Sequence, residues 1–466
     1  MAQSDNGCLA MFPPPHQFFY PQDNCHNLKY TWYGKKHLKV VPEYSMGIRQ
    51  DPVGDGRYIP WHNSPPGTKQ RLSVFYLLSS GSAKLAMKKV EAFTHKDSYP
   101  ALYKHKTFST HFHLGHTESV LKKRKGSQNP EFVDVFKKMG VNIVHPGEFH
   151  GDGNPKSSKI IRLKELKKLF EEGERLSDEN FIFLPGEEAN CHFGGHWMLL
   201  FDKPVYWYMN RKKGLPFVKE ELGYGKVYRT GNSADLLKLL KAEGGLAWTA
   251  HARIKSSRGF PDKYKDTDFF KSDQFLGAAW KNLPSDLSKP KLGWRILDLM
   301  DDMANWGEKK YCPAEVDVFK ISKTSELYAH MNINYMKLDK LPKYKDGWPK
   351  ISKALRDGKF FSTTGEILIP EFTVNGSESG DTVSLNGKTK VKFKASIDWT
   401  FPLNFAEVIM GDGKNVFRQK IDLSDSKAFG KKEINFDIDI KDKTWIRFEV
   451  WDVAANGAYT QPVWLK

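Results

Sequence analysis

The chain has 466 residues, of which 39% are hydrophobic and 27% are charged, and its formal net charge at pH 7 is +17. This composition is typical of a globular protein and excludes a disordered chain, and no apolar run reaches the roughly 20 residues that a membrane-spanning helix needs. The positive charge favours an anionic small molecule or oligosaccharide as substrate, and nucleic acid is not expected because no basic tail, zinc-finger spacing or RNA-binding aromatic motif accompanies the charge.

Residues 1–105 are predicted to form a small β-rich region, because short β-type runs such as residues 71–80 alternate with loops rich in proline and glycine. The chain starts without a basic segment followed by an apolar one, so no signal peptide is recognised. We therefore expect a periplasmic or secreted protein if a leader has been removed, and a cytoplasmic protein otherwise. Cys8 and Cys25 lie close enough in the sequence to pair in an oxidising compartment, and this pairing stays open.

Residues 106–370 alternate helical and β-type segments. The helical segments are residues 131–140, 159–176 and 233–245, and the β-type segments that follow them are residues 141–145, 180–188 and 246–251. Within the second helix we expect one apolar face, formed by Ile161, Leu166, Leu169 and Phe170. Repeated βα units of this kind predict an α/β fold with a parallel sheet or barrel.

The pattern changes after residue 370. Short alternating runs, such as residues 391–399 and 433–440, are separated there by glycine, aspartate and asparagine turns. Alternation of this kind predicts strands with one buried face. The sequence therefore predicts a C-terminal β-sandwich over residues 371–466.

The segment HFHLGHT, residues 111–117, places three histidines within seven positions. Side chains two residues apart on a strand point to the same face, so His111 and His113 can reach one metal ion. A surface cluster without a function is the alternative for so short a motif. The remainder of the sequence decides between the two interpretations.

Ligand-type side chains recur at the ends of the later β-type segments. They are Glu148 and His150, then Glu187, Glu188, His192 and His196, then His251, and finally Glu315 and Asp317. In a βα barrel the carboxyl ends of the strands meet at one mouth, where active sites lie. Imidazole and carboxylate ligands suit Zn, Mn or Fe. A core histidine or a solvated acid would explain any one of these residues, but not their recurrence at successive strand ends.

These residues resemble the motifs of the PHP (polymerase and histidinol phosphatase) metallohydrolase superfamily, and in particular its CehA/McbA-type branch. The HxH strand of the family is matched by His111 and His113, its PG-x-E strand by PGEE with Glu188 in the ligand position, the histidine that opens the next strand by His196, and its GG…AH strand by His251. Residues 354–383 resemble the segment that joins the barrel to a β-sandwich in that branch. The resemblance implies a distorted βα barrel with a polynuclear metal site that usually hydrolyses phosphoesters.

Two motifs depart from the family pattern. Phe149 stands where the family has an aspartate directly before the histidine, and Phe319 stands where the last D-x-H motif has its histidine. We therefore expect between one and three ions, fewer than a full trinuclear site if both departures remove ligands. His116, which lies beyond the usual motif, is a candidate for a replacement ligand or an acid–base residue.

The leading prediction is metal-assisted hydrolysis of an anionic substrate, either a phosphoester or an acidic or sulfated carbohydrate. The expected ligands of the Zn, Mn or Fe ions are His111, His113, Glu148, Glu188, His196, His251 and Asp317. His116 and His150 are expected to relay protons. Arg253 follows His251 by two residues, so on an extended strand end it shares the same face and could clamp the substrate anion.

Two alternatives keep parts of this prediction. A lyase or dehydratase acting on uronic-acid oligosaccharides would use the same metal to acidify a C–H bond. The second alternative is a non-catalytic carbohydrate-binding protein built on a decayed barrel. In either case Trp280 and Trp306 are candidates for stacking on sugar rings, although core packing is the more common fate of tryptophan.

Overall fold

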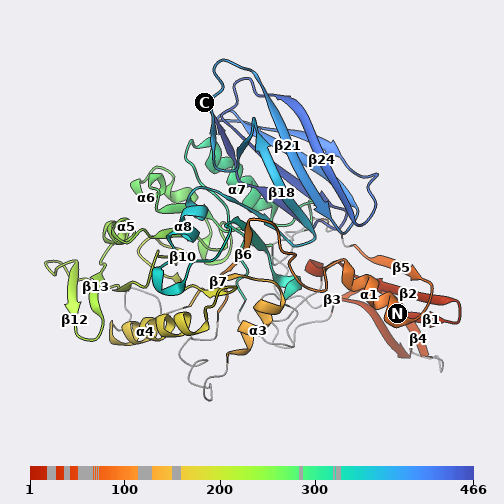
Figure 1. The fold of residues 1–466 in the computed structure, drawn as a ribbon, viewed down its shortest axis with the longest axis horizontal. Coiled ribbons are helices and arrows are strands. Elements are labelled where there is room, and N and C mark those ends of the chain that lie inside the picture. The colour runs from red at the N-terminus through yellow and green to blue at the C-terminus, as the bar shows by residue number, and fades with distance from the viewer. Residues whose placement is uncertain are drawn as a thin grey trace.

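The computed structural model describes residues 1–17, 28–35, 42–50, 67, 69, 71, 73–113, 129–148, 159–282, 287–318, 321 and 327–466. The fold is mixed α/β, as the sequence predicts. In Figure 1 the C-terminal strands, in blue, lie above the helices and short strands of the central region, and the N-terminal strands lie at the right. Among the described residues, no helix combines the length and the apolar content that crossing a membrane requires.

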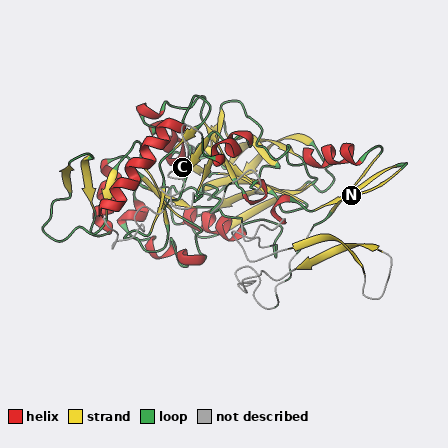
Figure 2. Ribbon diagram, turned by 90° about the horizontal axis from the view of Figure 1, so that it is seen from below, coloured by secondary structure: helices red, strands yellow, loops and turns green. Residues whose placement is uncertain are grey.

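The N-terminal region consists mainly of strands. β1 (Ala2–Ser4), β2 (Gly7–Phe12) and β5 (Phe75–Ser79) form one sheet, and β3 (Leu28–Lys35) pairs with β4 (Pro42–Gln50). These strands extend away from the rest of the molecule in Figure 2. The sequence did not predict α1 (Ala83–Ala92), which begins where the Ser82 side chain accepts a hydrogen bond from the Leu85 N–H and packs on β2 and β5. Cys8 is a buried free thiol on β2, and Cys25 lies outside the described residues.

Three parallel strands begin the central region: β6 (His105–Thr110), β7 (Ile143–His145) and β8 (Ile182–Phe183). The helices between them, α3 (Glu131–Lys138) and α4 (Lys159–Leu176), lie where the sequence predicts them. One detail of the prediction for α4 is wrong. Ile161 was expected on the apolar face, but it is exposed, whereas Leu166, Leu169 and Phe170 are buried. Five residues separate Ile161 from Leu166, which places them about 140° apart around a helix of 3.6 residues per turn.

A second sheet has the order β15 (Phe275–Ala278), β14 (Leu246–Thr249), β10 (Trp197–Leu200) and β9 (Glu187–Ala189). β14 and β15 are parallel, but β10 runs antiparallel to both of its neighbours. The parallel order expected from repeated βα units is therefore interrupted at β10. The physical reason is that β9 and β10 are joined by a short turn, which suits an antiparallel pair, and not by a helical crossover.

Parallel backbone bridges connect these two sheets. Glu148 pairs with Glu187, and Phe112 pairs with Val318. The segment that contains Val318 also pairs with the second sheet, because Gly277 is bridged to Tyr311 and Trp280 to Ala314. Residues 311–318 therefore lie between β15 on one side and the continuation of β6 on the other.

The remaining elements of the central region surround these strands. They are the strands β11 (Tyr206–Tyr208), β12 (Val218–Glu221), β13 (Gly225–Arg229), β16 (Ile333–Lys337) and β17 (Phe360–Thr363), and the helices α5 (Ser233–Ala242), α6 (Asp268–Lys271), α7 (Trp294–Asn305) and α8 (Pro349–Arg356). β16 runs antiparallel to β6, and β17 runs antiparallel to β16. The first sheet thus continues beyond β6 toward the C-terminal region.

The C-terminal strands form two facing layers. They are β18 (Ile367–Val374), β19 (Ser377–Glu378), β20 (Thr382–Val383), β21 (Lys390–Trp399), β22 (Leu403–Gly411), β23 (Val416–Asp422), β24 (Gly430–Asp439), β25 (Trp445–Asp452), β26 (Gly457–Thr460) and β27 (Val463–Leu465). One layer has the order β19-β18-β21-β24, and the other continues through β26 into β17 of the central region. The expected boundary between residues 370 and 371 lies within β18, and one hydrophobic cluster extends across it.

Candidate metal centre

His111 and His113 lie just beyond the carboxyl end of β6, at the junction of the two sheets. His111 has a left-handed φ of 68°, so the pair does not follow the simple alternation of a strand that the sequence suggested. Backbone hydrogen bonds nevertheless fix the segment on both sides. The His111 N–H donates to the carbonyl of His145, and the Asp317 N–H donates to the carbonyl of His111. Both imidazoles are therefore held next to the segment that carries Asp317.

Four buried side chains bring nitrogen and oxygen atoms together at this point. His111 Nε2 lies 3.3 Å from Glu188 Oε2 and 3.4 Å from Asp317 Oδ1. His113 Nε2 lies 3.5 Å from the same glutamate oxygen and 3.6 Å from the same aspartate oxygen. Two ligand atoms that are each about 2.0–2.2 Å from one tetrahedral ion lie about 3.3–3.6 Å apart. These four nitrogen–oxygen distances lie in that range.

Glu315 fixes the orientation of His111. Its Oε2 lies 2.7 Å from His111 Nδ1, so the carboxylate accepts that N–H and leaves the lone pair of Nε2 directed at Glu188 and Asp317. The other oxygen of Glu315 accepts the backbone N–H of His251. The sequence offered Glu315 as a ligand-type residue but gave no sign of this role, because the contact joins segments 204 residues apart.

The second oxygen of Glu188, Oε1, contacts two further imidazoles. His196 Nδ1 lies 2.7 Å from it and His251 Nε2 lies 2.9 Å from it. His251 is buried, whereas the side chain of His196 is 24% exposed. His111, Glu188 and His251 form one group that could hold an ion, and His111, His113 and Asp317 form another that shares His111.

The carboxylates give this centre an excess of negative charge. Burial by itself lowers the pKa of His111, but the carboxylates of Glu188, Asp317 and Glu315 outweigh burial and raise that pKa well above its ordinary value. Burial raises the pKa of Glu188, yet the adjacent imidazoles, His111 foremost, lower it well below its ordinary value. Both shifts have the same physical cause, which is the attraction between a positively charged imidazole and a negatively charged carboxylate.

Lys281 was not predicted from the sequence. Its side chain is almost fully buried, and Nζ lies 3.3 Å from Asp317 Oδ2 and 3.0 Å from the carbonyl of Val316. The sequence signal was weak, because a single lysine beside a tryptophan in WKNLP is ordinary. Only the approach of this segment to residues 311–318 shows that the ammonium contacts an acid of the centre.

Gly147 gives the imidazoles the space they occupy. A Cβ atom at this position would lie 2.8 Å from His111 Cδ2 and 3.4 Å from His113 Cε1. Real Cβ contacts essentially never come as close as 2.8 Å, so a side chain here would displace His111. Gly147 is therefore required by the space that the histidine pair occupies and not by its backbone conformation.

The other expected ligands lie apart from these groups or outside the described residues. Glu148 is buried beside the centre but belongs to neither of the two groups. Glu187 points elsewhere, to Arg162 and to the indole N–H of Trp207. His116 and His150, the expected proton relays, lie outside the described residues, as do Phe149 and Phe319.

Arg253 is not placed as the sequence suggested. β14 ends at Thr249, and Arg253 has a left-handed φ of 61°, so it does not share an extended strand face with His251. Its guanidinium lies 2.6 Å from Asp262 and 2.6 Å from Asp302. These two ion pairs engage the guanidinium group that was expected to hold the substrate anion. The pair with Asp302 also links the loop after β14 to α7.

The two tryptophans that were candidates for sugar stacking pack against hydrophobic side chains of the protein. Trp280 is fully buried, and its indole N–H donates to the carbonyl of Leu292. Trp306 packs against the same hydrophobic cluster, with Phe270 at a ring distance of 5.5 Å. Core packing is therefore the role of Trp280, and the sequence alternative of sugar stacking is wrong for it.

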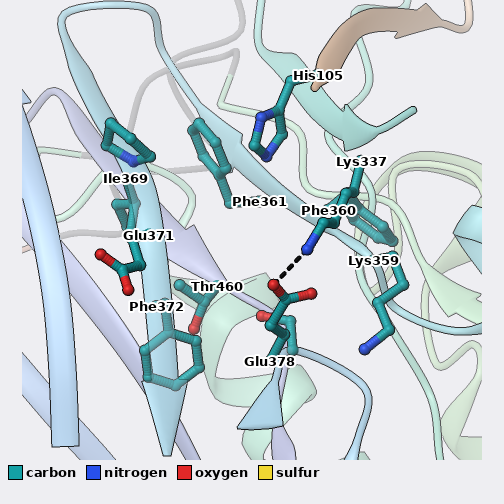
Figure 3. A pocket seen from close by; sticks show the side chains of 12 residues that line it. His105, Lys337, Lys359, Phe360, Phe361, Ile369, Glu371, Phe372, Glu378 and Thr460 are labelled. Carbon is teal, nitrogen blue, oxygen red and sulfur yellow. Dashed lines mark hydrogen bonds and ion pairs between the residues drawn. The ribbon is translucent and has the colours of Figure 1, made fainter. Parts of the chain in front are cut away.

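A small cleft lies at the opposite end of β6 from His111. It has a volume of about 90 Å³ and is lined by residues of both C-terminal layers and by His105. Figure 3 shows Lys337 pointing toward Glu378 across it, and the two side chains form an ion pair. His105 and His111 are six positions apart, so about 20 Å of strand separates the cleft from the metal centre.

No protein-family model matches the chain, and no curated protein matches it. Likenesses to solved structures are weak, and they include β-glucosidases from Erythrobacter marinus (8% identity, 78% of this chain and 47% of that chain covered, TM-score 0.15), from Listeria innocua (8%, 78%, 46% and 0.15) and from Bifidobacterium adolescentis (12%, 83%, 54% and 0.15). The chain spans about half the length of these structures. A TM-score of 0.15 carries no argument about fold or activity.

Proposed function

We propose that this chain is a PHP-type, metal-dependent hydrolase that acts on an anionic substrate. The observation that carries the proposal is the geometry around His111 Nε2. This atom is buried, has no hydrogen bond within the described part of the chain, and faces two carboxylate oxygens at 3.3 and 3.4 Å. Two carboxylate oxygens that converge on a buried nitrogen require a positive charge there, which a proton on His111 supplies in the metal-free chain and a divalent ion can supply in its place.

The strand pairings support a distorted βα barrel as the scaffold. The sheet of β6, β7 and β8 is linked to β9 by the bridge between Glu148 and Glu187. The second sheet then leads to β15, and residues 311–318 return to Phe112 beyond β6. A circuit of this kind gathers the residues after several strands at one place, which is where active sites of βα barrels lie.

A divalent ion bound there would supply Lewis acidity, which lowers the pKa of water and polarises an oxygen of the substrate. The residues of the chain supply the remainder. Glu315 holds the Nδ1–H of His111, which fixes the ligand tautomer. His196 donates its Nδ1–H to Glu188, so its Nε2 is the basic nitrogen and can accept a proton at the partly exposed edge of the centre.

The substrate class is inferred from charge. The chain carries a formal charge of +17, and such a field raises the local concentration of anions. A phosphoester, or an acidic or sulfated carbohydrate, meets this condition. Hydrolysis is the leading reaction, with His196 as the proton acceptor for water.

Metal content tests the proposal. The purified protein should bind Zn²⁺ or Mn²⁺ after chelation and dialysis, and hydrolysis of an aryl phosphate or sulfate should return with the metal. His111→Ala should abolish metal binding because His111 belongs to both candidate groups. His145→Ala is the matched control: this buried histidine binds Thr110 and the carbonyl of Leu199, so its loss should lower the melting temperature and leave metal content unchanged.

Two results would overturn the proposal. One is a folded wild-type protein that takes up no divalent metal. The other is a metal-loaded protein that releases no product from esters but produces absorbance near the ultraviolet edge with uronic-acid oligosaccharides, which would assign it to elimination.

A further inference from the structure

Asp317 and Glu188 each have a second carboxylate oxygen, and the contacts of these two oxygens limit the number of ions that the centre can hold. Asp317 offers Oδ1 to the histidine pair, while Oδ2 lies 3.3 Å from the ammonium of Lys281. Glu188 likewise offers Oε2, while its Oε1 contacts His196 and His251. A carboxylate bridges two metal ions by giving one oxygen to each. Lys281 therefore already holds the oxygen with which Asp317 would bridge to a second ion. Both candidate groups also share His111, whose Nδ1 is held by Glu315, so its remaining nitrogen can bind one ion and not two.

Lys281 is held in this position by more than its charge. Nζ also donates to the carbonyl of Val316, and its side chain is 1% exposed. The lysine follows Trp280, whose backbone is bridged to Ala314, so the two segments lie in register. The ammonium is thus built into the structure and cannot swing into solvent as a surface lysine does.

The charge count agrees with this arrangement. Three carboxylates contact His111, namely Glu188, Glu315 and Asp317. The positive charge of Lys281 offsets one of these three negative charges, and one divalent ion would neutralise the other two. A second divalent ion would leave these groups with an excess of buried positive charge, which is costly in a place shielded from water.

We propose that Lys281 takes the place of a second metal ion beside Asp317, so that the centre binds one divalent cation through His111, His113 and Asp317. The inference rests on the proposed function and deepens it. Lys281 acts as a positioning residue: its ammonium holds Asp317 Oδ2 and excludes another cation from it.

Metal stoichiometry tests the inference without relying on activity. Equilibrium dialysis against Zn²⁺ or Mn²⁺, followed by elemental analysis, should give one ion per wild-type chain. Lys281→Gln keeps a similar length, removes the charge and adds an amide oxygen. It should raise the stoichiometry toward two ions, and with Mn²⁺ the electron paramagnetic resonance spectrum should show two coupled ions. Lys281→Arg keeps the charge and should remain at one ion.

Lys310→Gln is the matched control. Lys310 is also buried, but its Nζ donates to the carbonyls of Ser272 and Phe275 and not to a carboxylate of the centre. This variant should show a comparable loss of thermal stability and keep one ion per chain. A change of stoichiometry in Lys281→Gln alone therefore separates a charge effect from general destabilisation.

The possible outcomes are decisive. Two or more ions in the wild-type chain, or one ion in a folded Lys281→Gln variant, would overturn the inference while leaving the metal-dependent function intact. If Lys281→Gln fails to fold, two ions in Lys281→Arg or in the wild type still contradict it, and one ion in both supports it. Absence of any bound metal in the wild type would remove the proposed function itself.

Discussion

Three of the candidate ligands have left-handed backbone conformations. The φ angles of His111, His251 and Asp317 are 68°, 33° and 57°. For residues with a Cβ atom such conformations cost of order 1–3 kcal/mol each, and they persist only where the surrounding contacts hold them. Glu315 provides such contacts, because it binds both the imidazole of His111 and the backbone N–H of His251. Strain at His111 and His251 is therefore compensated by one buried carboxylate.

This arrangement predicts a large effect of a small change at Glu315. Glu315→Gln keeps the shape but removes the charge, so His111 loses a charged acceptor for its Nδ1–H. Metal affinity should fall about 10–100-fold, the range found when partners of metal-bound histidines are changed. Calorimetric titration with Zn²⁺ measures this affinity. Glu449→Gln is the control, because Glu449 is equally buried but pairs with Arg447 in the C-terminal strands; equal affinity losses in both variants would contradict the prediction.

At the scale of elements, the turn between β17 and β18 places an acid inside the protein. Glu366 is 1% exposed, and neither of its carboxylate oxygens has a hydrogen-bond partner within the described residues. Gly365 packs so closely on Tyr328 that a Cβ atom there would lie 2.4 Å from the hydroxyl. Burial raises the pKa of Glu366 to about 7. The turn therefore stores an acid that is neutral below that pH.

This pKa predicts that Glu366→Gln stabilises the protein at high pH. Between about pH 4.5 and pH 7 the unfolded chain releases this proton while the folded chain retains it, so wild-type stability falls as the pH rises through that window. The variant lacks this loss. Its free energy of unfolding should exceed that of the wild type by about 3 kcal/mol at pH 8, at 1.36 kcal/mol per pKa unit, and by nothing at pH 4.

Urea denaturation at the two pH values measures the difference. A variant that is less stable than the wild type at both values would show that the carboxyl is stabilised by contacts and not penalised by burial.

At the scale of the whole molecule, the central and C-terminal regions share one sheet. β17 pairs with β16 on one side and with β26 on the other, so hydrogen bonds run from β6 into the C-terminal layer. β18 begins at Ile367 and ends at Val374, across the boundary expected from the sequence. A division at residue 370 therefore cuts a strand whose first three side chains are buried.

This continuity predicts how C-terminal fragments behave. Residues 366–466 contain all of β18, whereas residues 371–466 lack Ile367, Leu368 and Ile369. Burying each of these side chains contributes about 1.5–3 kcal/mol, and the sum rivals the 5–15 kcal/mol that stabilises a typical domain. The longer fragment should melt cooperatively and the shorter one should not. Circular dichroism melts of both decide, since both lack β17 equally; identical melting curves would place the boundary at residue 371 after all.

The sequence by itself determined several of the helices and strands, although not α1, and where ligand-type side chains follow the strands. Periodicity placed α3, α4 and β14, because an apolar face has the repeat of the element that buries it. The recurrence of ligand-type side chains, together with the resemblance to PHP motifs, singled out His111, Glu188 and Asp317, which the structure brings together. Tertiary structure alone decided the rest. The antiparallel course of β10, the engagement of Arg253 by Asp302, and the contact of Lys281 with Asp317 join segments far apart in the chain. Local patterns report burial and not partners, so these contacts depend on how the strands pack.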